Sequence, residues 1–199
     1  MQLRDFSGFV LIRHASIADK SILCGRTDCD IAPLSSAFSA QARAVLSEID
    51  VWFCSPVRSC QHSYAEIFGS APAPQQCDAR LWEQDFGEWE GSSYADLPDI
   101  GNLSGQQLAD FTPPGGESFS ELARRTRDVF DAYRQQAQKK PIGIMAHAGV
   151  IRSFIGHALG DASLGLSFVI SELSITQIGV YSDTQFAVAA CNQRIDICQ

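Results

Sequence analysis

The sequence predicts an α/β fold: a three-layer sandwich in which a mostly parallel central sheet is flanked by helices. Three short apolar runs, typical of buried strands, occur at residues 9–12, 51–54 and 142–146. A stretch with helical patterning follows each run before the next strand. Strands that alternate with helices in this way are typical of a parallel sheet covered on both faces.

Local residue preferences set the bounds of the elements in the first half of the chain. Ser is a good helix N-cap and Pro a good first helical residue, so Ser55 and Pro56 predict the start of a helix. Ser35 or Ser36 caps the helix before it in the same way. The expected elements, in chain order, are a strand at residues 9–12, a loop at 15–34, a helix at 35–48, a strand at 51–54, a helix at 55–68 and a loop at 70–79.

The second half contains the most helix-like stretch of the chain, residues 117–138. Leu122, Val129 and Phe130 form an apolar stripe on it. Gly160 closes the helix that follows, because glycine readily adopts the left-handed conformation at a helix end. The expected elements here are a turn-rich aromatic segment at 81–91, an irregular or weakly helical segment at 92–115, a helix at 117–138, a strand at 142–146, a helix at 150–159 and strands at 174–180 and 186–191.

Composition and charge exclude several classes of protein. The chain has 199 residues, of which 45% are hydrophobic, and 15 Lys and Arg against 23 Asp and Glu give a net charge of −8. Such an acidic chain lacks the basic face that binds nucleic acid. No apolar run approaches the roughly 18 residues of a membrane span, and the first residues do not form a signal peptide. We expect one domain over residues 1–199, located in the cytoplasm, with neither nucleic-acid nor membrane partners.

The seven cysteines include no Cys-x-x-Cys pair. In a cytoplasmic chain, cysteines in such a pattern are typically free thiols, mostly small buried side chains. The sequence therefore predicts free thiols and no zinc site at Cys24, Cys29, Cys54, Cys60, Cys77, Cys191 and Cys198.

Charged side chains follow three of the expected strands at the point where each strand ends. Arg13 and His14 follow the first strand, Arg58 lies just beyond the second, and His147 follows the third. In parallel sheets, ligands bind outside the carboxyl ends of the strands. We therefore expect these four residues to converge on one edge of the sheet.

Two histidines and an arginine at such an edge favour a site for phosphate, because guanidinium groups and helix N-termini both bind phosphate oxygens. A neutral histidine is a competent nucleophile toward phosphorus, and a second histidine can stabilise the charge that develops on the oxygens. A carboxylic acid must protonate the leaving oxygen, for which Glu83, Glu88 and Glu90 are candidates. Metal binding is the alternative use of His14 and His147, but no His-x-x-x-His or His-x-Asp pair accompanies them, so we expect no metal.

At these residues the sequence resembles the histidine phosphatase superfamily, the phosphoglycerate-mutase-like enzymes. The resemblance extends from residue 10 to about residue 159 and rests on a set of motifs in the family's order. These motifs are Leu-Ile-Arg-His-Ala at 11–15, Gly-Arg-Thr-Asp at 25–28 with Pro-Leu-Ser at 33–35, Cys-Ser-Pro at 54–56, the acid-bearing segment at 81–91, Pro-Gly-Gly-Glu-Ser at 114–118 and His-Ala-Gly-Val-Ile-Arg at 147–152.

The resemblance implies a phosphoglycerate-mutase-like fold and a metal-independent phosphomonoesterase that works through a phosphohistidine, with no cofactor. It implies that His14 accepts the phosphoryl group, that Arg13 binds it, that Glu83 is the general acid and base, and that His147 is the second phosphoryl-binding histidine. It also implies that residues 85–118 form a partial lid.

The sequence departs from the family pattern near the expected phosphate. Ala15 stands where the family has Gly. Ser59 stands where the family has Arg, and Arg58 lies one position earlier. One residue of a helix is about 100° of rotation, so Arg58 need not point the same way; we nevertheless predict that it binds phosphate. Lys20 stands near an Asn of many members and is interpreted as a solvated charge.

Among members of the superfamily, the small size and the segment at 86–91 resemble the small phosphatases, closest to the α-ribazole phosphatases of cobalamin assembly. The implied substrate is a small phosphorylated metabolite, with α-ribazole 5′-phosphate as the candidate. Two alternatives stay open. One is a phosphate- or phosphoprotein-binding module with weak or lost turnover. The other is a phosphoglycerate-type mutase, which usually needs more lid and more positive charge than this acidic chain supplies.

Overall fold

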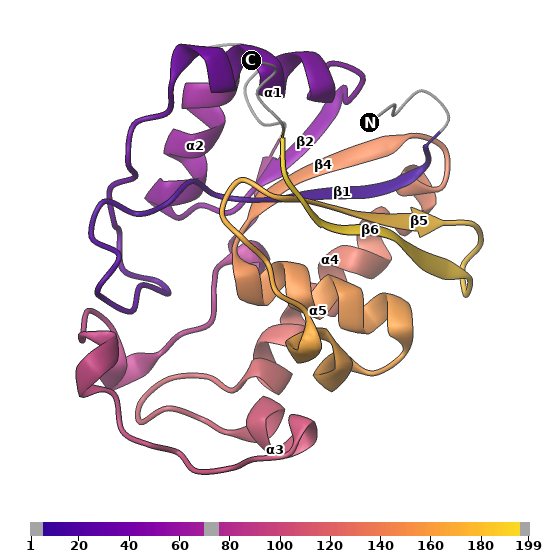
Figure 1. The fold of residues 1–199 in the computed structure, drawn as a ribbon. Helices are drawn as coiled ribbons and strands as arrows, with labels where there is room; N and C mark the ends of the chain where they lie inside the picture. Colours follow the sequence, from indigo (N-terminus) through magenta and orange to yellow (C-terminus); the bar gives the residue numbers. More distant parts are fainter. Residues whose placement is uncertain (1–5, 70–75, 196–199) are drawn as a thin grey trace.

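A computed structural model of the chain describes residues 6–69 and 76–195. Its strands form one six-stranded sheet in the order β3-β2-β4-β1-β5-β6 (Figure 1). The four strands from β3 to β1 run parallel, and β5 and β6 are antiparallel additions at one side, which confirms the mostly parallel sheet. The strands are β1 (Gly8–Arg13), β2 (Val51–Cys54), β3 (Gln76–Cys77), β4 (Pro141–Ala146), β5 (Ile175–Val180) and β6 (Phe186–Gln193).

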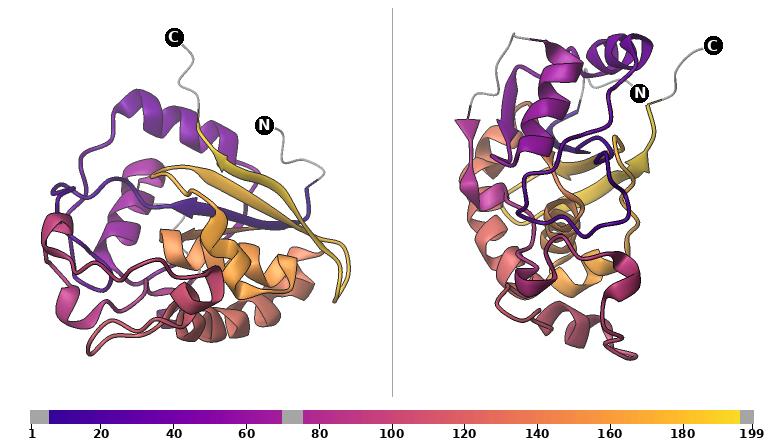
Figure 2. Two further views of the ribbon diagram at one scale, coloured as in Figure 1. Left: turned by 60° about the horizontal axis from the view of Figure 1, so that its bottom comes forward. Right: turned by 90° about the vertical axis from the view of Figure 1, so that its left-hand side faces the viewer.

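Helices cover both faces of this sheet, as the two views of Figure 2 show. Side chains alternate along β1, so Phe9 and Leu11 pack toward α4 and α5, whereas Val10 and Ile12 pack toward α1 and α2. The helices are α1 (Ser36–Leu46), α2 (Arg58–Phe68), α3 (Gly105–Asp110), α4 (Phe119–Ala137) and α5 (Ala148–Leu159). None of the helices in the described part of the chain is long and apolar enough to cross a membrane.

Local caps explain most helix ends. The side chains of Ser118 and Glu121 form a reciprocal capping box at the start of α4. The carboxyl end of α5 is capped by Gly160, which has φ +84°, the left-handed conformation expected of a glycine cap. The predicted start of α2 at Ser55 is wrong, because the Ser55 hydroxyl pairs with His147 and the helix begins at Arg58.

The predicted loop at residues 70–79 is wrong in part. Residues 76–77 form the short strand β3, which pairs with the end of β2, and residues 70–75 lie outside the described residues. The segment at 92–115, predicted to be irregular or weakly helical, contains the short helix α3, in agreement with that prediction. The first five residues and Cys198 also lie outside the described part, so the expectations for them stay predictions.

The pairing of β1 with β4 positions the candidate site. These neighbouring parallel strands are in register up to Arg13 opposite Ala146. The ladder continues for one more hydrogen bond, which the N–H of His14 donates to the carbonyl of Ala146 at 2.9 Å. His14 and His147 therefore leave the sheet side by side at its carboxyl edge. The loop after β1 and the segment between β3 and α4 lie at the same edge (Figures 1 and 2).

Packing between β2 and β4 predicts that a methyl group added at Gly143 destabilises the fold. Gly143 lies opposite Trp52, and a Cβ at position 143 would overlap the indole ring. We expect Gly143→Ala to lower the free energy of unfolding by about 1–3 kcal/mol, the usual cost of overpacking a core. Gly105→Ala is the control, because a Cβ there meets open space. Urea denaturation measures both, and equal stability of Gly143→Ala and the natural protein would contradict the packing described.

Candidate active site

A cavity of about 510 Å³ opens at the carboxyl ends of β1 and β4. Four of the five residues predicted for the site line it: Arg13, His14, Glu83 and His147. Arg58 is not among the lining residues. A volume of this size is typical of small-molecule sites.

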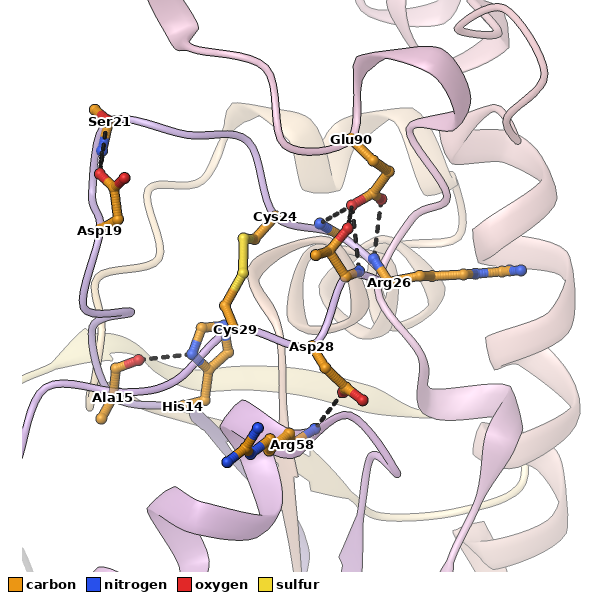
Figure 3. Close-up of a disulfide and its surroundings, with 12 residues drawn as sticks. His14, Ala15, Asp19, Ser21, Cys24, Arg26, Asp28, Cys29, Arg58 and Glu90 are labelled. Atoms are coloured by element: carbon orange, nitrogen blue, oxygen red, sulfur yellow. Dashed lines mark hydrogen bonds between the residues drawn. A yellow bond between two sulfur atoms is a disulfide. The ribbon is translucent and has the colours of Figure 1, made fainter.

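His14 presents one ring nitrogen for chemistry. Its Nδ1 lies 2.7 Å from the carbonyl oxygen of Ala15 (Figure 3). Because a carbonyl only accepts, Nδ1 carries the proton and the lone pair is on Nε2. Burial, followed by the charge of His147, lowers the pKa of His14 to about 3. The ring is therefore neutral at physiological pH, as a nucleophile must be.

Ala15 is accommodated where the family has glycine. Among the described residues, the non-glycine residues with positive φ are Leu173 and Asn192, so Ala15 is not strained in this way. Its N–H donates to the Ser63 hydroxyl at 2.8 Å. The methyl group of Ala15 is fully buried. Because the backbone at Ala15 is unstrained and its N–H is paired, the replacement of glycine by alanine does not disturb the chain beside His14.

His147 is the second imidazole of the site. It is buried at the start of α5, and its ring centroid lies 5.0 Å from that of His14. Its Nε2 lies 2.8 Å from the Ser55 hydroxyl. Burial lowers the pKa of His147 to about 3, and the charges of Arg13 and Arg125 act in the same direction. Binding of an anion in the cavity would favour a proton on this ring.

Glu83 brings a buried carboxylate to the same cavity. One carboxylate oxygen accepts the N–H of Gly149 and the other accepts the N–H of Gln84, each at 3.0 Å. Gly149 lies in the first turn of α5, where the helix dipole favours a negative charge. A Cβ at position 149 would clash with the Glu83 carboxylate in its present position, so a larger residue there would displace the carboxylate. Of the other candidate acids, Glu88 is exposed and Glu90 binds a loop, and neither lines the cavity.

An ion-pair network holds the backbone of Glu83. Arg125 on α4 donates to the Glu83 carbonyl at 2.8 Å and pairs with Glu117 through Nη2 at 2.6 Å and Nε at 3.2 Å. Arg26 also pairs with Glu117, at 3.1 Å. Two-point contacts of this kind fix orientation as well as distance. The network therefore connects the loop that carries Arg26 to the backbone of Glu83, the candidate acid.

The side chain of Arg58 points away from the cavity. Its guanidinium pairs with Asp30 at 3.1 Å, and its side chain is 51% exposed. The backbone N–H of Arg58 donates to the carboxylate of Asp28 at 3.2 Å (Figure 3). Ser59 is the buried residue that lines the cavity. One residue along the helix rotates the side chain by about 100°, which accounts for the difference. The structure thus does not bring Arg58 together with the other four predicted residues.

Two further polar residues contribute to the site and were not predicted for it, Arg152 in the cavity wall and Ser55 behind His147. Arg152 lines the cavity, and its Nε donates to the carbonyl of Phe168 at 2.9 Å. Its signal is helical spacing, because Ala148 and Arg152 are four residues apart on α5 and share a face. Ser55 supports His147, and a serine at a strand end gives no such signal. No group of three His, Cys, Asp or Glu side chains in residues 6–69 and 76–195 is placed to hold a metal ion.

Cys24 and Cys29 form a disulfide (Figure 3), so the prediction of free thiols is wrong for these two residues. Cys54, Cys60, Cys77 and Cys191 are free. The disulfide closes a loop whose N–H groups, from residues 25–27, donate to the carboxylate of Glu90. The carboxylate folds the loop back on itself and brings the two cysteines together, which their spacing alone did not indicate. Both cysteines line the cavity.

Comparisons with known proteins identify the family. The family model of the histidine phosphatase superfamily (branch 1) matches residues 9–193. A bifunctional protein of Mycobacterium tuberculosis is 33% identical over 123 residues, which are 58% of this chain and 33% of that protein. The chain thus matches about a third of the length of this relative.

Two solved structures share the fold. A mycobacterial glucosyl-3-phosphoglycerate phosphatase superposes with a TM-score of 0.80 at 20% identity, over 94% of this chain and 99% of that one. The α-ribazole phosphatase of Shigella flexneri superposes with a TM-score of 0.72 at 23% identity, over 94% of this chain and 96% of that one. At these identities the likeness concerns the fold alone.

The buried histidines predict a loss of stability in mild acid. The pKa values of His14 and His147 are lowered to about 3 from an ordinary value of 6.5. Below pH 6.5 these two histidines bind protons in the unfolded chain but stay neutral in the folded chain. The free energy of unfolding therefore falls as the pH falls. Each histidine contributes about 2 kcal/mol to the loss between pH 7 and pH 5. Guanidinium denaturation at pH 7 and pH 5 measures this fall in unfolding free energy, which should be smaller for His14→Gln than for the natural protein. An equal fall in the two proteins would contradict a neutral, buried His14 ring.

The disulfide predicts a second effect on stability. We expect the double variant Cys24→Ser, Cys29→Ser to lose about 2 kcal/mol of unfolding free energy, because the short cross-linked loop gains entropy in the unfolded state. A thiol reductant should destabilise the natural protein equally and leave the double variant unchanged. Cys77→Ser, at a free and exposed cysteine, is the control. Denaturation curves that do not respond to the reductant would show that the pair does not form in solution.

Proposed function

The chain belongs to the histidine phosphatase superfamily, and from this membership we propose that it is a metal-independent phosphomonoesterase that works through a phosphohistidine at His14. One observation carries the proposal: a neutral imidazole with its Nε2 lone pair free lies beside a second buried histidine and a buried carboxylate in one cavity. A phosphoryl transfer needs a nucleophile, donors for the phosphoryl oxygens and a proton donor.

In the first step, Nε2 of His14 attacks phosphorus and the bond from phosphorus to the ester oxygen breaks. The carboxyl group of Glu83 gives its proton to the leaving oxygen, so the alcohol leaves neutral. His147 and Arg13 hold the remaining phosphoryl oxygens. Among the described residues, the buried Nε of Arg13 has no hydrogen-bond partner. Arg152 adds a second positive charge to the same part of the cavity.

In the second step, water attacks the phosphohistidine and the bond from phosphorus to Nε2 breaks. The carboxylate of Glu83 accepts the proton of that water, and inorganic phosphate leaves. His14 is then neutral again with its Nε2 lone pair restored, because Nδ1 keeps its proton on the Ala15 carbonyl throughout. Glu83 serves as acid in one step and base in the next, the usual arrangement when one group faces both oxygens.

The proposed substrate is a small phosphorylated metabolite, with α-ribazole 5′-phosphate as the candidate. The fold shared with an α-ribazole phosphatase and the ring-bearing side chains of Phe86, Trp89 and Tyr94 on the cavity wall support this choice. We also propose that residues 85–118 act as a partial lid of a single domain over residues 1–199. A cytoplasmic location is part of the same proposal, although the disulfide is unusual there, where such bonds are mostly catalytic or redox-sensing.

One observation favours a second candidate function, a phosphate-binding module with weak turnover. Ser59 occupies the cavity position at which the family has arginine, so the phosphoryl part of the cavity has one positive charge fewer. The buried carboxyl group of Glu83 favours the hydrolase, because a module that only binds an anion has no use for a group that donates and accepts a proton beside it. Trapping of phosphohistidine by rapid acid-free quench distinguishes the two functions, since a module that only binds forms none.

Substitution of the nucleophile and the acid tests the mechanism. We expect His14→Ala to abolish hydrolysis of an aryl phosphate in the presence of a chelator. Glu83→Gln should slow hydrolysis of an alkyl phosphate by roughly 10²–10⁴, and of an aryl phosphate by less, because a good leaving group needs no proton. The neighbouring Glu88→Gln is the matched control, since Glu88 is exposed outside the cavity. Equal losses for both esters would argue against Glu83 as the acid.

A further inference from the structure

The cavity has two parts of different chemistry. The part next to the sheet holds the histidine pair with its arginines and the carboxylate. The part away from the sheet is lined by the segment that precedes α4, which contributes Tyr94, Leu97, Ile100, Leu108 and Phe111. These five side chains come from a stretch that also contains several aspartates, none of which lines the cavity. The segment therefore turns its apolar side chains inward.

The rest of the wall of this second part is also apolar. It is not a separate face: it comes from the loop after β1, which contributes Ile17, Ile22 and Leu23 next to the disulfide and is joined to the segment of Tyr94 by an antiparallel bridge between Ile22 and Ser93. A phosphoryl group alone fills a small fraction of about 510 Å³. The remaining volume is lined largely by these two apolar segments and is available to the alcohol part of an ester.

Charge is scarce in this second part. The charged residues that line the cavity are Arg13, Lys20, Glu83, Arg152 and Glu172. Arg13 and Arg152 belong to the phosphoryl part with Glu83, and Glu172 pairs with Arg13 at 3.2 Å. Of the described lining residues, Lys20 is thus the one cation left for a second anionic group, and it lies exposed on the loop after β1. A second phosphate or a carboxylate usually requires a guanidinium fork, which this part of the cavity does not present.

The exposed fractions of two of these apolar side chains indicate a surface for a ligand rather than side chains packed against one another. Tyr94 is 56% exposed and Leu108 is 40% exposed, although both line a concave surface. Contiguous apolar surface of this kind marks binding sites more often than scattered single residues do. A bound apolar group would remove this surface from water.

We propose that the substrate is the monophosphate ester of an uncharged, mainly apolar alcohol, and that Tyr94, Leu97 and Leu108 determine this specificity by burying the alcohol. The inference rests on the proposed phosphatase function and specifies its substrate class. It favours ring-bearing or aliphatic alcohols and disfavours bisphosphates and phosphorylated carboxylic acids.

A series of n-alkyl phosphates tests the proposal, because the leaving alcohols have nearly equal pKa values and differ only in apolar length. We expect kcat/KM to rise about twofold to fourfold with each methylene from ethyl to hexyl phosphate, the range that corresponds to burial of one methylene. 3-Phosphoglycerate should be at least about tenfold worse than butyl phosphate, since its carboxylate meets apolar walls.

Matched variants locate the effect. Leu108→Ser and Tyr94→Ser should flatten the increase with chain length, so that the ratio of kcat/KM for hexyl phosphate to that for ethyl phosphate falls several-fold in each variant. Leu159→Ser and Tyr181→Ser are the controls, because these side chains are similarly exposed, at 45% and 63%, and do not line the cavity. Equal effects of the test and control variants would overturn the assignment of these residues.

The possible outcomes separate this inference from the proposed function. Hydrolysis of every ester at the same kcat/KM would overturn the inference and leave the phosphatase standing. If no ester is hydrolysed, the phosphatase is refuted, and the affinity of n-alkylphosphonates, measured by calorimetry, still tests the apolar part of the cavity. Affinity that rises with alkyl length and falls in Leu108→Ser supports it, whereas affinity independent of length refutes it.

Discussion

The parallel pairing of β1 with β4 is the interaction on which the candidate site depends. The two strands end in register, and the bond from the His14 N–H to the Ala146 carbonyl is the last of their ladder. Two histidines that are 133 positions apart in the sequence thereby become neighbours. The same strand end starts α5, whose first turn supplies the N–H that binds Glu83. A shift of one residue in this register would turn one histidine to the other face of the sheet.

A second constraint extends from α4 to the loops. The pair formed by Glu117 and Arg125 holds the carbonyl of Glu83, and Arg26 joins it from the disulfide loop. Glu83 is thus fixed at both ends: the network holds its backbone carbonyl, and the N–H groups of Gly149 in α5 and of Gln84 hold its two carboxylate oxygens. Such support is what holds a catalytic group in position, because a loop by itself leaves the side chain free to move.

Much of the fold could be predicted from the sequence, because apolar runs and caps are local signals. The central strands, the sheet type and the meeting of His14 with His147 follow from them. The direction of Arg58 could not be predicted, since it depends on where α2 begins, and that start is set by the distant pairing of Ser55 with His147. The disulfide was missed for a similar reason. Its loop is folded by the carboxylate of Glu90, more than sixty positions away.

The contact between Glu90 and the disulfide loop has a consequence for how the cavity opens. Glu90 belongs to the segment that leads to Tyr94 and α3, and it accepts three N–H groups and one hydroxyl from residues 25–27 (Figure 3). The two apolar walls therefore do not move as independent loops. An outward motion of Glu90 must either carry the cross-linked loop with it or break these hydrogen bonds, so opening of the cavity at this point involves both segments together.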